Sequence, residues 1–132
     1  MIGSNTTEAH PVLALRIKKA VRYGATLVVA DPRAIWLTKI AKRHLQLRPG
    51  SDVWLLNAIM HVILEEGLQD DAYIAEHCED FDAVREVVAR YTPEDAERVT
   101  GVPAEAIRAT AREYATERHA AIFYTLGITE HA

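Results

Sequence analysis

The chain has very little cysteine and no long apolar run. Of its 132 residues only Cys78 is a cysteine, so no internal disulfide can form. No segment approaches the roughly 20 consecutive apolar residues that a membrane-spanning helix requires. The first residues carry no positive charge, unlike the start of a secretory signal peptide. These absences predict a cytoplasmic protein without a membrane segment.

Motifs that mark common enzyme and nucleic-acid-binding classes are also missing. There is no G-x-S-x-G nucleophile turn, no Walker phosphate loop and no G-x-G-x-x-G. The six histidines lack zinc-like spacing with a cysteine, because His77 and Cys78 are merely neighbours. The formal net charge is −4, and basic residues are not interleaved with aromatic ones, which argues against a nucleic-acid partner. No stretch of the chain looks like a reaction centre.

Charge is present, but it is unevenly divided along the chain. Residues 1–66 carry nine Lys or Arg against five Asp or Glu, whereas residues 67–132 carry six against fourteen. A basic N-terminal half suits an anionic ligand. A chance distribution of surface charge is an equally acceptable interpretation.

The N-terminal half has the pattern of strands alternating with helices. An amphipathic helix is expected over residues 11–23, ending at Gly24, with an apolar stripe of Leu13, Ile17, Ala20 and Val21. Residues 26–30 are apolar on both faces, as in a parallel strand covered by helices. The other expected elements are the end of a strand at Met1-Ile2, a short helix over 34–41 and a strand over 45–47.

The C-terminal half predicts helices followed by a closing strand over residues 120–125. One helix start is marked by Thr92 as the capping residue and Pro93 at the first helical position. The expected helices cover residues 52–66, 70–77, 80–91, 93–99 and 103–116, the last with an apolar stripe of Ile107, Ala111 and Tyr114. We therefore predict an α/β fold: one Rossmann-like three-layer domain over residues 1–132. It would have a short, mostly parallel sheet and a helical insertion at about residues 68–100.

One predicted helix is unusually apolar. In residues 53–64 only Asn57 and His61 are not apolar. A helix that is apolar on nearly all sides is buried on nearly all sides. We expect another piece of protein to cover part of it, or the chain to self-associate through it.

Three polar loops follow or flank the predicted strands. Gly3, Ser4 and Asn5 form a small turn before a helix, where backbone N–H groups can hold a phosphate. The alternative is an ordinary capped loop. Ser51 and Asp52 begin the apolar helix, so they are helix-capping residues that can in addition contact a ligand.

Asp31 and Arg33 follow the predicted strand over residues 26–30. A carboxylate at the carboxyl end of such a strand commonly accepts hydrogen bonds from ribose hydroxyls or a base, and Arg33 can pair with a phosphate. An Asp-Pro turn with a solvated Arg33 is the equally weighted alternative. We predict that loops 3–8, 31–33 and 50–52 meet at one edge of a single sheet.

A set of short motifs in conserved order carries a resemblance to a known family. The motifs are Gly3-Ser4-Asn5 with His10-Pro11, Asp31-Pro32-Arg33, Leu47-Arg48-Pro49-Gly50-Ser51-Asp52, Leu55-Leu56-Asn57-Ala58, Tyr91-Thr92-Pro93-Glu94, Thr100-Gly101-Val102 and Gly127-Ile128-Thr129. With these, the chain resembles the molybdopterin oxidoreductases, and within them the alpha (catalytic) subunits of formate dehydrogenases.

The resemblance implies a cofactor site and a set of residues for it. In that family this region is part of a Rossmann-like domain that holds a molybdopterin guanine dinucleotide. The implied cofactor-binding residues are Gly3, Ser4, Asn5 and Glu8 along the cofactor, Asp31 and Arg33 near its guanosine end, Gly50, Ser51 and Asp52 beside it, and Gly127, Thr129 and Glu130 at a second approach.

The resemblance also implies that the catalytic parts lie elsewhere. The family binds molybdenum through a Cys or selenocysteine upstream of this region, and Cys78 is not at that position. The chain is then an internal fragment whose partner is the rest of the parent catalytic subunit. That parent would oxidise formate, while the fragment alone would be inactive and empty of cofactor. The alternative is a stand-alone nucleotide-binding or protein-interaction module without redox activity.

Overall fold

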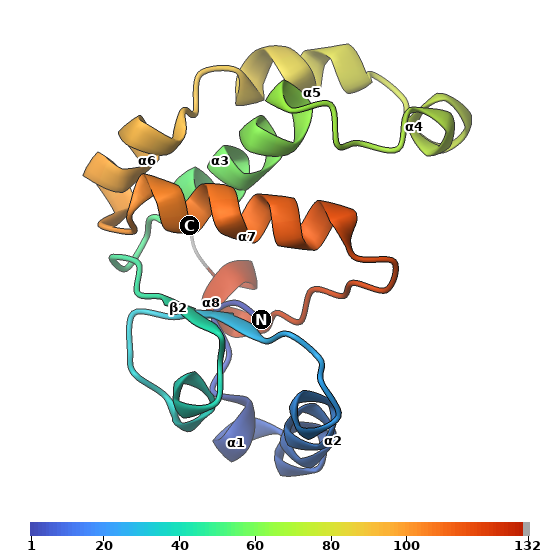
Figure 1. The fold of residues 1–132 in the computed structure, drawn as a ribbon. Helices are drawn as coiled ribbons and strands as arrows, with labels where there is room; N and C mark the ends of the chain where they lie inside the picture. Colours follow the sequence, from blue (N-terminus) through green and yellow to red (C-terminus); the bar gives the residue numbers. More distant parts are fainter. Residues whose placement is uncertain (131–132) are drawn as a thin grey trace. The chain divides into compact units, whose positions relative to one another are not determined.

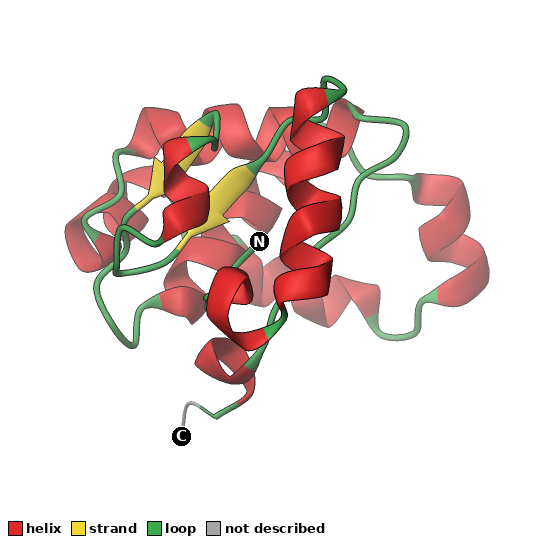
Figure 2. Ribbon diagram, turned by 90° about the horizontal axis from the view of Figure 1, so that it is seen from below, coloured by secondary structure: helices red, strands yellow, loops and turns green. Residues whose placement is uncertain are grey.

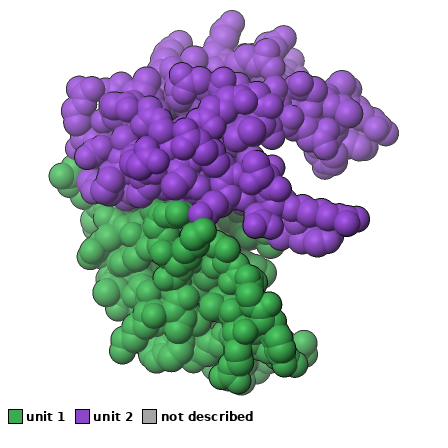
Figure 3. Space-filling model, in the orientation of Figure 1, with its two compact units in different colours: residues 1–50, 121–132 green, residues 51–120 purple. Residues whose placement is uncertain are grey.

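The computed structural model describes residues 1–130 and divides the chain into two compact units (Figure 3). Unit 1 contains residues 1–50 and the C-terminal residues from 121, and unit 2 contains residues 51–120. Three helices of unit 2 fall at the place of the predicted insertion: α4 (Asp71–His77), α5 (Phe81–Val88) and α6 (Pro93–Thr100). The organisation as one domain stays a prediction.

Unit 1 combines short helices with a small parallel sheet (Figure 1). Its elements are α1 (Thr6–Ala9), α2 (Pro11–Arg22), β1 (Val28–Ala30), the 3-10 helix η1 (Trp36–Lys39), β2 (Arg43–Leu45) and α8 (Leu126–Thr129). Strands β1 and β2 lie side by side and are parallel, with Ala30 opposite Leu45 (Figure 2). This confirms the α/β class with a short parallel sheet, while the Rossmann-like three-layer form stays a prediction.

Two further extended segments add to this sheet by single parallel bridges. Ile2 bridges to Ala30 on one side and to Tyr124 on the other. The Ile2 N–H donates to the Phe123 carbonyl at 2.9 Å, and the Ala30 N–H donates to the Met1 carbonyl at 2.9 Å. The order across the sheet is therefore the segment at Tyr124, Ile2, β1 and β2, all running in the same direction.

The predicted strand over residues 120–125 was too long. The structure has one bridge there, at Tyr124, because its partner segment turns away after Ile2. Gly3 has φ +57°, a left-handed conformation that ends the extended run. The pairing between the segment at Tyr124 and the segment at Ile2 therefore does not continue past Ile2.

The other two predicted elements of unit 1 are shifted or shortened. The strand expected over 45–47 is β2 at Arg43–Leu45, because the Leu47 N–H turns back to the Leu45 carbonyl at 3.0 Å. Leu47 is nevertheless buried. The helix expected over 34–41 is the single 3-10 turn η1, held by the Thr38 hydroxyl and N–H on the Ile35 carbonyl.

One cluster of buried apolar residues in unit 1 lies between α2, β1 and η1. It consists of Ile17, Val29, Ile35 and Leu37, against which Met1, Leu13, Leu27, Ile40 and Ala41 pack. The amphipathic pattern of residues 11–23 therefore identified the buried face of α2 correctly at Leu13 and Ile17, although Ala20 on the same predicted stripe is exposed.

Unit 2 is helical. Its helices are α3 (Asp52–Glu65), α4 (Asp71–His77), α5 (Phe81–Val88), α6 (Pro93–Thr100) and α7 (Ala104–Thr116), close to the predicted ranges. Helix α3 packs against α5, α6 and α7. Thr92 caps α6 as its sequence indicates, because its hydroxyl accepts the Asp95 N–H at 3.2 Å. Tyr114, placed on the buried stripe of α7, is instead 41% exposed.

Most of the apolar helix α3 is covered within unit 2. Leu55, Ala58 and Val62 are fully buried, whereas Val53 and Met60 are exposed. His61 is half-buried, and its Nδ1–H donates to the Val88 carbonyl at 3.1 Å. This hydrogen bond gives the polar ring a partner within the apolar helix. Self-association through this helix stays a prediction. Within residues 1–130 no helix is both long and apolar enough to cross a membrane.

Candidate functional site

The candidate site is the edge of the unit 1 sheet where its parallel segments end. Gly3 follows Ile2, Asp31 follows β1, Gln46 follows β2 and Thr125 follows Tyr124. Because bridged parallel strands end at the same edge, the loops after them share that edge. Two of the three loops predicted to meet, 3–8 and 31–33, are therefore brought together.

Asp31 is buried at this edge, and one of its carboxylate oxygens accepts a hydrogen bond within the turn that it begins. Its side chain is 3% exposed, and its Oδ1 accepts the Arg33 N–H at 2.8 Å and lies 3.5 Å from the Arg33 Nε. The Asp31 carbonyl accepts a hydrogen bond from the His44 Nε2–H at 2.8 Å. The turn interpretation is thus correct, and it leaves Oδ2 as the oxygen for a ligand hydroxyl or amine.

The guanidinium of Arg33 projects from the same turn. Its side chain is 71% exposed, although its Nε approaches Asp31. An exposed guanidinium whose stem is anchored next to a buried carboxylate can pair with a phosphate in a bidentate manner. Arg33 and Asp31 therefore offer a cation and an anion at neighbouring positions on one loop.

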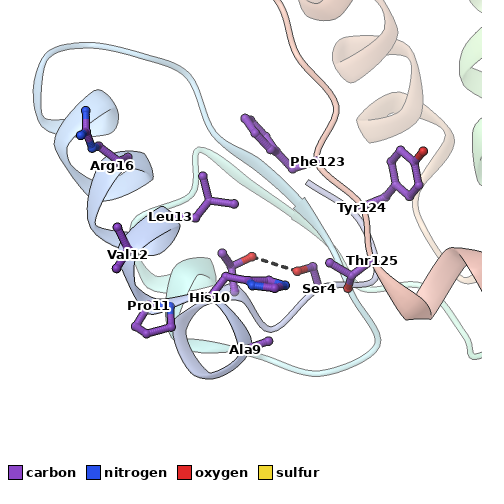
Figure 4. Close-up of a pocket in the computed structure, with 11 residues that line it drawn as sticks. Ser4, Ala9, His10, Pro11, Val12, Leu13, Arg16, Phe123, Tyr124 and Thr125 are labelled. Carbon is purple, nitrogen blue, oxygen red and sulfur yellow. Dashed lines mark hydrogen bonds between the residues drawn. The ribbon is translucent and has the colours of Figure 1, made fainter.

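The first loop contains a chain of hydroxyl groups that determines what Ser4 can offer. The Thr6 hydroxyl lies 2.9 Å from the Met1 sulfur, and Ser4 and Thr6 are 2.9 Å apart (Figure 4). Either hydroxyl of the Ser4–Thr6 pair can be the donor. Ser4, which is buried, keeps at least one oxygen lone pair that can accept from a ligand.

Asn5 and Glu8 belong to a short helical turn that the sequence did not predict. The turn opens into α1, which has four residues, and α2 begins separately at Pro11. Asn5 occupies the N-cap of α1 without a side-chain capping bond, and its Oδ1 accepts the Thr7 hydroxyl at 2.9 Å. The Asn5 amide nitrogen is then the group that can still donate, while Glu8 is exposed.

Gly3 and Gly127 touch each other through their backbones. A Cβ added to Gly127 would lie 2.5 Å from the Gly3 carbonyl oxygen, and a Cβ added to Gly3 would lie 2.9 Å from the Gly127 carbonyl carbon. The hydroxyl of Thr125 donates to the Gly3 carbonyl at 2.9 Å. Both glycines, predicted as cofactor residues, thus have a packing role as well.

An open pocket of about 680 Å³ lies beside the first loop (Figure 4). It is lined by Ser4, Thr6, Ala9, His10, Pro11, Val12, Leu13, Arg16, Phe123, Tyr124 and Thr125. Figure 4 shows Ser4 and Thr125 together at one side and Arg16 at the other. Thr125 was not predicted, because no local signal links it to a partner 122 residues away.

The remaining predicted residues lie on other segments of the chain. Gly50 belongs to unit 1, where it is exposed with φ +78°, while Ser51 and Asp52 are buried at the start of α3 in unit 2. Their meeting with the other loops stays a prediction. Thr129 and Glu130 are exposed at the end of α8 in unit 1.

The groups in the described chain whose pKa is shifted are not predicted site residues. In unit 2, hydrogen bonds from Arg112 lower the pKa of Glu66, and the backbone and Arg108 lower that of Glu94. In unit 1, burial lowers the pKa of the Met1 amino group. Among residues 1–130 no group of three or more His, Cys, Asp or Glu side chains is placed to hold a metal ion.

The donor and acceptor set at the edge fits the nucleotide end of a dinucleotide. Arg33 and the Asn5 amide are donors of the kind that phosphate oxygens accept. The Asp31 carboxylate and the Ser4 oxygen are acceptors for hydroxyl or amino groups of a ribose or base. Cys78 is exposed and lies directly after α4 in unit 2.

Comparisons with known proteins agree on one family. The chain is 44% identical to formate dehydrogenase H of Escherichia coli (strain K12) over 98% of its own length and 18% of that protein. It is 42% identical to the F420-dependent formate dehydrogenase 2 subunit alpha of Methanococcus maripaludis, over 98% of the chain and 19% of that protein.

A solved structure shares the fold. Acetylene hydratase from Pelobacter acetylenicus superposes with a TM-score of 0.88 at 31% identity, covering 96% of this chain and 18% of that one. The chain thus spans less than a fifth of each of these relatives. The family model described as molybdopterin oxidoreductase matches residues 1–132. From its first residue to its last, the chain therefore belongs to the molybdopterin oxidoreductase family.

Proposed function

We propose that unit 1 holds the guanosine diphosphate end of a molybdopterin guanine dinucleotide within a formate dehydrogenase-type oxidoreductase. The observation that carries this proposal is the shared sheet edge, at which Ser4, Asn5, Asp31 and Arg33 follow the ends of parallel segments. The Rossmann-like character of the sheet is part of the same proposal. Such folds bind dinucleotides at the carboxyl ends of their strands.

Each residue has a role that follows from its hydrogen bonds. Arg33 and the Asn5 amide donate to phosphate oxygens, and the free Oδ2 of Asp31 accepts from the ribose or the guanine. Ser4 accepts from a hydroxyl or amino group through a lone pair of the hydroxyl that is hydrogen-bonded to Thr6. The bound cofactor supplies the molybdenum centre at which substrate is oxidised in the whole enzyme.

Formate is the substrate we propose for the whole enzyme, because the similar curated proteins are named formate dehydrogenases. The segment itself does not select formate, since a protein named acetylene hydratase shares its fold. The substrate would then be chosen by parts of the larger subunit, which we propose as the partner of these 132 residues in the cytoplasm. The cofactor-holding role is separate from that choice.

Calorimetric titration of the chain with GDP tests the proposal. Asp31→Asn keeps an oxygen for the Arg33 N–H but removes the charge offered to the ligand. We expect Kd for GDP to rise about tenfold, as for one charge-assisted hydrogen bond. The matched control is Asp82→Asn on α5, whose carboxylate is 96% exposed and should leave Kd unchanged.

Two results would contradict the proposal. The first is a chain that releases no heat with GDP at millimolar concentration while circular dichroism shows it to be folded. The second is a Kd that Asp31→Asn raises no more than Asp82→Asn does, which would mean that the Asp31 carboxylate makes no specific contact with GDP.

A further inference from the structure

The loop after Ile2 and the segment after Tyr124 meet without any side chain between them. At Gly127 a Cβ would lie 2.5 Å from the Gly3 oxygen and 2.7 Å from the Gly3 Cα. No real Cβ tolerates such distances, so the two backbones can cross only where both residues are glycine. Gly3 also has φ +57°, which a side chain would strain.

Two hydrogen bonds hold this crossing in place. The Thr125 hydroxyl donates to the Gly3 carbonyl at 2.9 Å, and the Ile2 N–H donates to the Phe123 carbonyl at 2.9 Å. The first is a side-chain bond that one substitution can remove. The second is a backbone bond, whose N–H reports by hydrogen exchange whether the crossing stays closed.

We propose that Thr125 is a positioning residue for cofactor binding, acting through Gly3. Together Thr125, Gly3 and Gly127 form a clasp that sets the spacing between the loop carrying Ser4 and Asn5 and the segment carrying Thr129 and Glu130. This inference rests on the proposed function. It adds that the loop carrying Ser4 and the segment carrying Thr129 have a fixed spacing before the ligand binds.

The position of Ser4 explains why a small displacement matters. Ser4 directly follows Gly3, and its hydroxyl is hydrogen-bonded to the Thr6 hydroxyl. The Thr6 hydroxyl also lies 2.9 Å from the Met1 sulfur. A Gly3 carbonyl released from Thr125 can rotate its peptide plane and so re-aim the Ser4 N–H and the residues after it. Donors that must be ordered by the ligand bind it more weakly.

The test combines GDP titration with amide hydrogen exchange on the same samples of the 132-residue chain. Thr125→Val removes the hydroxyl at nearly constant volume, and Thr125→Ser restores it. The matched control is Thr116→Val on α7, where a threonine hydroxyl likewise donates to a backbone carbonyl, that of Arg112 at 2.8 Å.

We expect Thr125→Val to raise Kd for GDP about fivefold, the loss corresponding to one hydrogen bond. Exchange at the Ile2 amide should quicken, while exchange at the β1 and β2 amides stays slow. Thr125→Ser should return both values to those of the unsubstituted chain. Thr116→Val should change neither Kd nor exchange at Ile2.

Three outcomes would overturn the inference. If exchange at Ile2 quickens but Kd is unchanged, the clasp supports the fold and positions nothing. If Thr125→Val leaves exchange unchanged, there is no clasp. If the unsubstituted chain does not bind GDP, the proposed function fails, and the positioning role fails with it. The exchange data then still show separately whether Thr125 closes the crossing.

Discussion

At the residue scale, the candidate site depends on groups that serve their own backbone first. The Asp31 carboxylate orders the turn to Arg33, and the Ser4 and Thr6 hydroxyls are hydrogen-bonded to each other. What is left for a ligand is one carboxylate oxygen, hydroxyl lone pairs, an amide nitrogen and a guanidinium. Such local bonds fix the direction of these groups without a ligand, which lowers the entropy lost on binding.

Gly127 provides a prediction at this scale. Gly127→Ala should lower the free energy of unfolding by about 1–3 kcal/mol, because its Cβ cannot fit beside the Gly3 carbonyl. Urea denaturation followed by circular dichroism measures the change. Amide exchange at Ile2 should quicken in the same variant.

Gly24→Ala is the comparison for this prediction. Gly24 has φ +98° and no heavy atom within 4 Å of an added Cβ, so alanine there is strained only through its own backbone. It should reduce stability while leaving exchange at Ile2 slow. Equal exchange at Ile2 in the two variants would show that the crossing of Gly3 and Gly127 is not a specific contact.

At the element scale, unit 2 is organised around α3. Leu55, Ala58 and Val62 bury one face of α3 against its neighbouring helices. At the end of α3, Glu66 accepts three hydrogen bonds from Arg112 of α7, at 2.8 to 3.1 Å. This pair joins two helices far apart in sequence at the surface of unit 2.

The Glu66–Arg112 pair predicts an acid-sensitive contribution to stability. Arg112 lowers the pKa of Glu66 in the folded chain, so the contribution is present above the ordinary carboxyl pKa of 4.5 and is lost as pH falls through the lowered folded value. Glu66→Gln should lower Tm by about 1–3 °C at neutral pH. The difference from the unsubstituted chain should disappear in strong acid.

Differential scanning calorimetry across the acid range measures this effect. Glu117→Gln, an exposed carboxylate after α7, serves as control and should leave Tm unchanged at every pH. A Glu66→Gln effect that persists undiminished in strong acid would mean that the ion pair is not its source.

At the scale of the whole molecule, the chain is less than a fifth of the relatives it matches. We predict that the 132-residue chain alone does not oxidise formate, because its unit 1 offers groups for a nucleotide and no thiolate. Reduction of a viologen dye by formate measures this. Formate dehydrogenase H assayed in parallel is the positive control, and turnover by the isolated chain above that of buffer would refute the prediction.

Much of this architecture could be predicted from the sequence because it is a local property. The pattern of residues 11–23 predicted α2, the β-branched run up to Ala30 predicted β1, and Thr92-Pro93 predicted the start of α6. Helix periodicity, strand alternation and capping depend on neighbours within a few residues. The family followed from short motifs in order, and the match over residues 1–132 confirmed it.

What the tertiary structure alone decided involves partners distant in sequence. Tyr124 has a single bridge because Ile2 is followed by the left-handed Gly3. Position 127 requires a glycine because a Cβ there would collide with the backbone of Gly3. The Thr125 hydroxyl donates to the carbonyl of Gly3, which lies 122 residues away in the sequence. A pattern read along the chain carries no information about such contacts, because they form only when the loops are brought to one edge of the sheet. The sequence by itself thus determined the elements and the family, and the packing of those elements decided which residues meet.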